Sequence, residues 1–237
     1  MKIKAEKRQY INMKYTINDI TVIILAGGRG SRLGNQNKGL IKLNNTQETI
    51  INATKSKPVK EVTFVSHLLS KLISQSQTQI ISANDNISEY EKYNTRVIQD
   101  QTGGYQGPLS GIISCKSFIH TPLVLTVPCD SPLVPDTLSQ RLLDTYNQKD
   151  STQICVAHDG TRLQNLFMLF DTQLLDNMND YFHENNRRVH SWIECQNKLK
   201  RFQQVDFSDC AINFTNVNNE ENLQALLKLE PSLGEAR

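Results

Sequence analysis

Short apolar runs alternate along the chain with stretches in which apolar residues recur at helical spacing. The apolar runs predict strands at residues 21–25, 79–83, 96–98, 122–127, 154–157 and 201–207. The helical spacing predicts helices at 62–72, 108–118, 135–143, 174–182 and 189–195, and a last helix to 229 that Asn218 or Asn219 caps. Strands that alternate with helices imply crossover connections, so we expect an α/β fold with a mostly parallel sheet.

Polar or glycine residues lie just past the ends of four predicted strands. They are Gly27, Asn84, Asp100 and Asp130. In open α/β sheets, ligands bind beyond the carboxyl ends of the strands. A polar residue is common at any strand end, so each of the four has an ordinary explanation by itself. As a set they indicate a ligand site at one edge of the sheet.

The length of 237 residues suits a single domain. We expect a polar N-terminal extension at 1–18, one domain at 19–230 with a loop insertion at 44–60, and a tail at 231–237; either Met1 or Met13 begins the protein. Hydrophobic content of 38%, charged content of 21% and a net charge of +2 are typical of a globular protein. We find no membrane span, signal peptide or nucleic-acid-binding tail in the sequence. Because the net charge is small, an anionic substrate would have to be bound by cations close to the site.

The five cysteines are scattered and form no CxxC pair. This spacing argues against a disulfide framework and against a zinc site, and it predicts free thiols in a reducing cytoplasm. Cys129, next to Asp130, is either a nucleophile or a small apolar packing residue. We favour packing, because no local pattern supports a nucleophile.

A glycine-rich loop, LAGGRGSR at residues 25–32, follows the first strand. Glycines let the backbone approach phosphate oxygens closely and form an anion nest. The dinucleotide pattern GxGxxG fails, because Leu33 stands where the third glycine is needed. The Walker pattern fails as well, because Lys38 is followed by Gly39 and not by Ser or Thr. The loop is therefore either a phosphate loop of another kind or a structural turn.

Cations near this loop favour the phosphate interpretation. Arg29, Arg32 and Lys38 would repel one another unless water or an anion lies among them. A triphosphate supplies that anion, and a solvated basic loop is the alternative. Lys38 would then act as a compact point charge on the phosphates, and Arg32 could bind a phosphate in bidentate fashion.

Asp100 and Asp130 are the candidate carboxylates, since each follows a buried apolar run. Nucleotidyl transfer builds charge on phosphate oxygens, and Mg²⁺ held by one or two carboxylates commonly balances it. The alternative for each residue is a helix cap or a turn, and Asp130 does precede Ser131-Pro132.

At these residues the sequence resembles the nucleotidyltransferases that act on the molybdenum cofactor. The similar segments are LAGGRGSR (25–32), KGL (38–40), VIQD (97–100), GPLSG (107–111), PCDSP (128–132), RLQ (162–164), RRV (187–189) and NVN (216–218). The resemblance as a whole extends over about residues 21–227. The double glycine and the GPLSG segment resemble the guanylyltransferases, the MobA family, more than the cytidylyltransferase relatives.

The resemblance implies a Rossmann-like, three-layer nucleotidyltransferase fold in a monomeric, cytoplasmic enzyme. It implies that GMP passes from GTP to the molybdopterin form of the cofactor, with Mg²⁺ as the cofactor of the enzyme and pyrophosphate as the second product. Expected partners are GTP and molybdopterin, with cofactor-delivery proteins and molybdoenzymes as further candidates and neither nucleic acid nor membrane. The implied GTP-binding residues are Leu25, Ala26, Gly27, Gly28, Lys38, Asn84, Asp100 and Asp130.

Roles in the reaction follow from the same resemblance. Asp130 is the expected metal ligand, and Lys38, Asp130 and Arg32 are the expected catalytic residues. The residues expected toward the pterin are Arg187, Arg188, Asn216 and Asn218.

Two residues depart from the family pattern. Asn37 stands where the family usually has Asp before the lysine, and Asn165 replaces a usual proline, which predicts a looser strand entry there. Both departures keep open the alternative of a non-catalytic protein that binds nucleotide or cofactor. A cytidylyl or sugar-1-phosphate nucleotidyltransferase with the same glycine loop is a further alternative.

Overall fold

The computed structural model describes residues 15–27, 37–43, 62–100, 106–149 and 151–229. The expected tail, most of the N-terminal extension and the expected insertion at 44–60 lie outside the described residues. Two expected site residues, Gly28 and Arg32, lie outside them as well.

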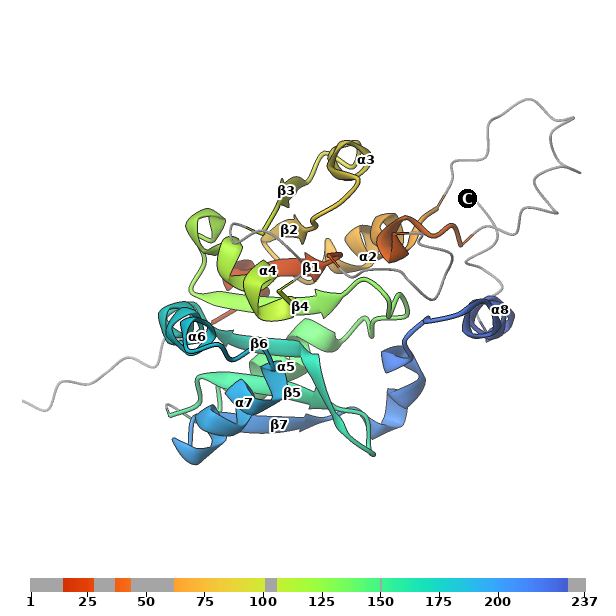
Figure 1. Cartoon of the computed structure of the whole chain (residues 1–237). Helices are drawn as coiled ribbons and strands as arrows, with labels where there is room; N and C mark the ends of the chain where they lie inside the picture. Colours follow the sequence, from red (N-terminus) through yellow and green to blue (C-terminus); the bar gives the residue numbers. More distant parts are fainter. Residues whose placement is uncertain (1–14, 28–36, 44–61, 101–105, 150, 230–237) are drawn as a thin grey trace, which may run out of the picture.

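The described strands form one seven-stranded sheet in the order β3-β2-β1-β4-β6-β5-β7 (Figure 1). All neighbouring pairs are parallel except those that involve β6, which runs antiparallel to both β4 and β5. The bounds are β1 Ile20–Leu25, β2 Thr78–Ser82, β3 Arg96–Ile98, β4 Leu123–Pro128, β5 Ile154–His158, β6 Leu163–Asp171 and β7 Phe202–Asp206. The prediction of a mostly parallel α/β sheet is confirmed.

Helices lie on both faces of the sheet (Figure 1). The α-helices are α2 Phe64–Leu72, α3 Ile87–Glu91, α4 Pro108–Ser114, α5 Leu138–Tyr146, α6 Leu174–His183, α7 Val189–Lys198 and α8 Glu220–Leu229. The 3₁₀ helices are η1 Ile17–Asp19, η2 Lys38–Leu40, η3 Lys116–Phe118 and η4 Ser208–Phe214. None of the helices in the described part of the chain is long and apolar enough to cross a membrane.

The fold has three layers, helices on each face of the central sheet, and a hydrophobic core lies between the sheet and each helix layer. Alternate side chains of β1 enter different cores: Val22 and Ile24 pack with α2 and α5, whereas Ile23 packs with α4, α6 and α7. This alternation is the period of a strand covered on both faces. The three-layer arrangement that the resemblance implied is therefore present.

A third apolar cluster fastens the segment that follows η2. Ile41 and Leu43 pack there against Phe64 at the start of α2 and against Leu223 and Leu226 of α8. Each buried aliphatic side chain of this kind contributes about 1.5–3 kcal/mol. The cluster thus holds the C-terminal helix close to η2.

Several predicted boundaries differ from the structure for local reasons. The helix predicted at 62–72 begins at Phe64, because Thr63 accepts a hydrogen bond from the Ser66 N–H and caps it. The helix predicted at 108–118 divides at Cys115 into α4 and η3. Asn219 caps α8, since its Oδ1 accepts from the Asn222 N–H at 2.8 Å, so this alternative of the predicted pair is confirmed.

Candidate nucleotide site

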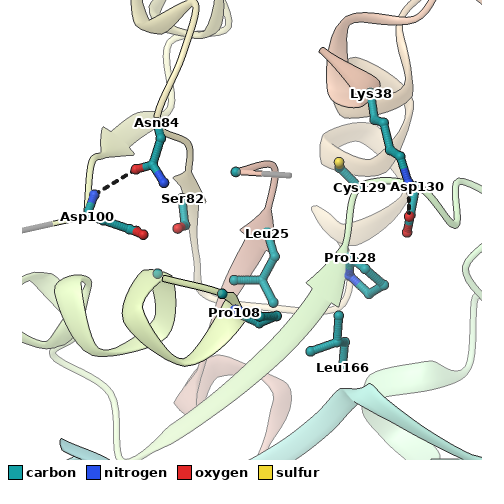
Figure 2. Close-up of a pocket in the computed structure, with 13 residues that line it drawn as sticks. Leu25, Lys38, Ser82, Asn84, Asp100, Pro108, Pro128, Cys129, Asp130 and Leu166 are labelled. Atoms are coloured by element: carbon teal, nitrogen blue, oxygen red, sulfur yellow. Dashed lines mark hydrogen bonds and ion pairs between the residues drawn. The ribbon is translucent and has the colours of Figure 1, made fainter. Parts of the chain in front are cut away.

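A cavity of about 380 Å³ opens at the carboxyl ends of β1, β2 and β4. Leu25 is the last residue of β1 and Gly27 follows it, Asn84 follows β2, and Asp130 follows β4. Figure 2 shows Lys38 and Asp130 on one side of the cavity and Asn84 and Asp100 on the other. The prediction that strand ends bring these polar residues to one site is confirmed.

An ion pair forms the first wall. Lys38 Nζ donates to Asp130 Oδ2 at 2.9 Å, and both side chains are 20% exposed. The same ammonium donates to Asn218 Oδ1 at 2.6 Å. The lysine thus bridges the end of β4 and the segment before α8. This wall of the cavity therefore presents the Lys38 ammonium and the Asp130 carboxylate side by side, and each can bind a ligand group of opposite charge.

Asn37 and Tyr90 position Lys38. Asn37 caps η2, since its Oδ1 accepts from the Gly39 N–H at 3.3 Å, and it also accepts from the Tyr90 hydroxyl at 2.5 Å. Tyr90 is fully buried, and a Cβ on Gly39 would collide with its hydroxyl oxygen. Burial raises the pKa of Tyr90 far above its ordinary value, with smaller contributions from Cys129, Tyr93 and Asp85. The hydroxyl therefore stays a neutral donor at any working pH.

Asn84, Asp100 and Ser82 form the opposite wall. Asn84 Oδ1 accepts from the Asp100 backbone N–H at 2.9 Å, which fixes the orientation of the amide. The Asp100 carboxylate and the Ser82 hydroxyl make no hydrogen bond within the described part of the chain. A Cβ on Gly111 would lie 2.5 Å from Ser82 Oγ and 3.5 Å from Asp100 Oδ1. Glycine at this position of α4 therefore leaves both oxygens open to the cavity.

The C-terminal segment docks beside Asp130. The Val217 N–H donates to the Asp130 carbonyl oxygen at 2.7 Å, and Ser131 Oγ donates to Asn216 Oδ1 at 2.5 Å. With the bond from Lys38 to Asn218, three consecutive residues of this segment contact the first wall. The segment that the resemblance assigned to the pterin side therefore also supports the lysine.

Arg187 lies at the rim near α4, and its guanidinium is engaged. It donates to Gln106 Oε1 at 3.1 Å and to the Phe182 carbonyl at 2.7 Å, and it lies 4.0 Å above the Phe182 ring. Arg188 is exposed and precedes α7. Neither arginine is among the residues that line the cavity.

Most, but not all, of the predicted GTP-binding residues line the cavity. Those that do are Leu25, Gly27, Lys38, Asn84, Asp100 and Asp130. Ala26 is buried in the hydrophobic core and is not a lining residue; its N–H donates to the Ser82 carbonyl at 2.7 Å. The glycine loop from Gly28 onward lies outside the described residues.

The remaining candidates have clear environments. Cys129 is buried beside Asp130, and burial raises the pKa of its thiol well above the ordinary value, so the packing interpretation holds. Asn165 lies on β6, opposite a shift in the β5–β6 register, and its Oδ1 is buried without a partner in the described residues. The strand nevertheless begins at Leu163 and is continuous.

Sequence reasoning missed two residues of this site. Ser82 was placed inside a predicted strand that ran to residue 83, but it is the last residue of β2 and so lies at the strand end that lines the cavity. Tyr90 carries no local signal, since its contact with Asn37 joins positions 53 residues apart.

The chain is similar to known nucleotidyltransferases over most of its length. The MobA-like NTP transferase domain matches residues 22–205. A molybdenum cofactor guanylyltransferase of Vibrio cholerae is 36% identical over 215 residues, which cover 90% of this chain and 94% of that protein. Another, of Cupriavidus metallidurans, is 31% identical over 210 residues, which cover 87% and 93%.

Solved structures share the fold. Molybdopterin-guanine dinucleotide biosynthesis protein A from Archaeoglobus fulgidus matches with a TM-score of 0.63 at 16% identity, over 90% of this chain and 99% of that one. A nucleotidyl transferase from Methanothermobacter matches with a TM-score of 0.66 at 16% identity, over 90% and 97%.

Proposed function

The chain belongs to the MobA-like NTP transferase family and, within it, to the molybdenum cofactor guanylyltransferases, and we propose that it transfers GMP from GTP to molybdopterin. The products are the guanine dinucleotide form of the cofactor and pyrophosphate. The single observation that carries the proposal is the arrangement of the cavity. One wall presents the contacting Lys38 and Asp130, and the other presents Asp100 beside Ser82.

The charges of the two walls orient the nucleotide. A triphosphate needs cations, and Lys38 is the cation that lines the described part of the cavity. The base then lies toward Asp100, whose carboxylate can accept both the N1–H and the 2-amino group of guanine. Adenine and cytosine present a ring-nitrogen acceptor at the matching position, which a carboxylate repels. Gly28 and Arg32 on the glycine loop stay predicted phosphate contacts.

The chemistry is an in-line displacement. A phosphate oxygen of molybdopterin attacks the α-phosphorus of GTP, the bond to the β-phosphate oxygen breaks, and pyrophosphate leaves. The acceptor is already an anion, so no side chain has to remove a proton. The contribution of the protein is positioning and electrostatic stabilisation. The Lys38 ammonium stabilises charge on the leaving phosphates, and Asn37 and Tyr90 hold it in place.

We propose Mg²⁺ as the cofactor, with Asp130 as its protein ligand. Mg²⁺ commonly takes one or two carboxylates and completes its shell with phosphates and water. The Asp130 carboxylate faces the cavity, and no group of three or more His, Cys, Asp or Glu converges within the described ranges. This donor set fits an ion that arrives with the nucleotide. When bound, the ion neutralises charge on the phosphates around the reacting phosphorus.

The direct test combines the protein, Mg²⁺, molybdopterin and one nucleotide at a time. We expect pyrophosphate and the dinucleotide cofactor with GTP, and neither with CTP or ATP. Asp130→Asn should abolish turnover. Asp136→Asn, which removes an 81% exposed carboxylate paired with Lys71, is the matched control and should leave turnover unchanged. Full activity of Asp130→Asn would contradict the assigned metal ligand.

The same assay separates the alternatives. Turnover with CTP alone, or with a sugar 1-phosphate as acceptor, would indicate a different nucleotidyltransferase. GTP binding without pyrophosphate release would indicate a carrier. We further propose a monomer in the cytoplasm that hands its product to cofactor-delivery proteins and molybdoenzymes; gel filtration and co-purification test these points.

A further inference from the structure

Arg187 lies in the turn between α6 and α7, and its side chain is held in one orientation. Its guanidinium lies 4.0 Å above the ring of Phe182, which is 4% exposed and belongs to the core under α4, α6 and α7. Its Nη1 donates to the carbonyl oxygens of Phe182 at 2.7 Å and of Asn186 at 3.0 Å. Because a guanidinium is planar and rigid, these contacts also fix the direction of its other N–H groups.

One of those N–H groups reaches the segment that leads into α4. Arg187 Nε donates to Gln106 Oε1 at 3.1 Å, across 81 positions of the sequence. The next residue, Gly107, has a φ of 90°, a conformation that favours glycine. A Cβ on Gly107 would lie 3.7 Å from the Arg187 carbonyl oxygen. The side chain and the backbone of Arg187 therefore both meet the start of α4.

The start of α4 is part of the cavity wall, although Arg187 is not. Pro108 and Gly111 line the cavity, and a Cβ on Gly111 would lie 3.5 Å from Asp100 Oδ1. In Figure 2, Pro108 on the first turn of α4 lies below Asp100. A shift at this end of α4 would therefore change the space beside the Asp100 carboxylate.

We infer that Arg187 is a positioning residue: it fastens the segment before α4 to α6 and thereby sets the wall of the cavity beside Asp100. Three of its five N–H groups are used within the protein and one face of the guanidinium is covered by Phe182, so its contacts are those of a fastener and not of an acceptor-binding cation. The inference rests on the proposed use of GTP, since it is GTP binding that this wall is expected to control.

The experiment measures the dissociation constant of the GTP–Mg²⁺ complex and the KM values for GTP and for molybdopterin. Gln106→Leu removes the acceptor, and Arg187→Lys keeps the positive charge but loses the planar fork. We expect each variant to raise the Kd and the KM for GTP about five- to tenfold, the ratio for one net hydrogen bond. The KM for molybdopterin should stay within about twofold of wild type.

The double variant tests whether the two residues act together. Gln106→Leu combined with Arg187→Lys should bind GTP about as weakly as either single variant, because both substitutions remove the same contact. Gln106→Glu tests the hydrogen bond itself. A carboxylate can accept from Nε–H as the amide oxygen does, so this variant should keep the GTP affinity of wild type to within about twofold.

Arg96→Lys is the matched control. The Arg96 guanidinium also lies over a ring, 4.9 Å above Phe118, but the residue is at the amino end of β3 and is not among the residues found to line the cavity. All three constants should stay within about twofold of wild type. The fluorescence of Trp192, which is fully buried on α7 and is the one tryptophan of the sequence, checks the packing of α7 in every variant.

Two results would overturn the inference. One is an Arg187→Lys protein with unchanged GTP affinity and a raised KM for molybdopterin, which would make Arg187 an acceptor contact. The other is a double variant in which the two losses multiply, which would show that Arg187 and Gln106 act separately. The Kd for GTP is measured without molybdopterin, so if it follows the expected pattern while no GMP is transferred, the proposed reaction fails and the positioning role stands.

Discussion

Tyr90→Phe tests whether the hydroxyl of a residue outside the cavity lining sets the position of Lys38. The substitution removes one oxygen and leaves the ring in its fully buried site. Asn37 Oδ1 then keeps only the Gly39 N–H, whose bond is the longer of the two at 3.3 Å against 2.5 Å. The side chain of Asn37 can rotate, and the cap that begins η2 at Lys38 loosens.

The size of the effect follows from the lost hydrogen bond. One net hydrogen bond contributes about 1 kcal/mol to the free energy of unfolding, with a range of about 0.5–1.5 kcal/mol. For a chain of this size that corresponds to a decrease in Tm of roughly 2–4 °C. A displaced catalytic group can cost up to about a hundredfold in rate per ångström, so we expect kcat/KM for GTP to fall about tenfold.

Tyr93→Phe is the matched control. Its hydroxyl pairs with Thr63 Oγ1 at 2.8 Å, so the same atom is lost and a similar decrease in Tm is expected. Within the described residues Tyr93 makes no hydrogen bond to η2, so kcat/KM should stay within about twofold of wild type. The assays are a thermal melt and pyrophosphate release over a range of GTP concentrations. Equal kcat/KM in the two variants, with equal Tm, would refute a positioning role for Tyr90.

Three further predictions concern other parts of the structure. At pH 8, a thiol reagent should modify the exposed Cys195 rapidly and leave Cys129 intact, because burial raises the pKa of Cys129; loss of GMP transfer on labelling of a Cys195→Ala variant would contradict this. Asn218→Ala should lower kcat through Lys38, which lies 2.6 Å from its Oδ1, whereas a change confined to the KM for molybdopterin would support the pterin assignment instead. Burial opposes ionisation of Asp159, but hydrogen bonds from Thr161, Arg162 and Gln164 outweigh it and hold the pKa of Asp159 well below its ordinary value. The stability that the ionised Asp159 contributes is therefore present above the ordinary carboxyl pKa and is lost as the pH falls below it. Asp159→Asn should lower Tm at pH 7 and should make the decrease of Tm toward pH 2 shallower than in wild type. Parallel profiles of Tm against pH for wild type and variant would contradict this.

The middle of the sheet was predictable because β1, β4 and β5 are buried along all or nearly all of their length. Every residue of β4 is buried, and a continuous apolar run of that kind predicts a strand from the sequence alone. β6 was not assigned by the hydrophobic pattern. Its first half alternates irregularly and its second half, LFMLF, is apolar throughout, a pattern that does not distinguish a strand from a helix. Its antiparallel direction depends on pairing with β4 and β5, which no local window contains.

The candidate site divides in the same way. Asn84, Asp100 and Asp130 were identified because each follows a strand, and the sheet itself brings strand ends together. Asn37 was noted as a departure, but its function as a hydrogen-bond acceptor for Tyr90 became visible only when the α3 segment was placed beside η2. The loss of the negative charge at this position leaves Lys38 in place, since an amide oxygen accepts the same two hydrogen bonds that a carboxylate would.

The pairing of Lys38 with Asp130 explains how two charged side chains remain half-buried at the proposed nucleotide site when no nucleotide is bound. Each charge satisfies the other at 2.9 Å, so neither is left buried without compensation. A triphosphate that arrives with a divalent cation offers a better partner to each: phosphate oxygens for the ammonium and the metal ion for the carboxylate. The exchange conserves the number of compensated charges, and Asn218 keeps one contact to Lys38 while it occurs. A triphosphate without the cation could pair with Lys38 only by placing its own negative charge beside the Asp130 carboxylate, which would then have no positive partner. If the chain uses GTP and Mg²⁺ as proposed, we therefore expect the metal–nucleotide complex to bind this wall more tightly than the free nucleotide, and a GTP titration with and without Mg²⁺ tests this.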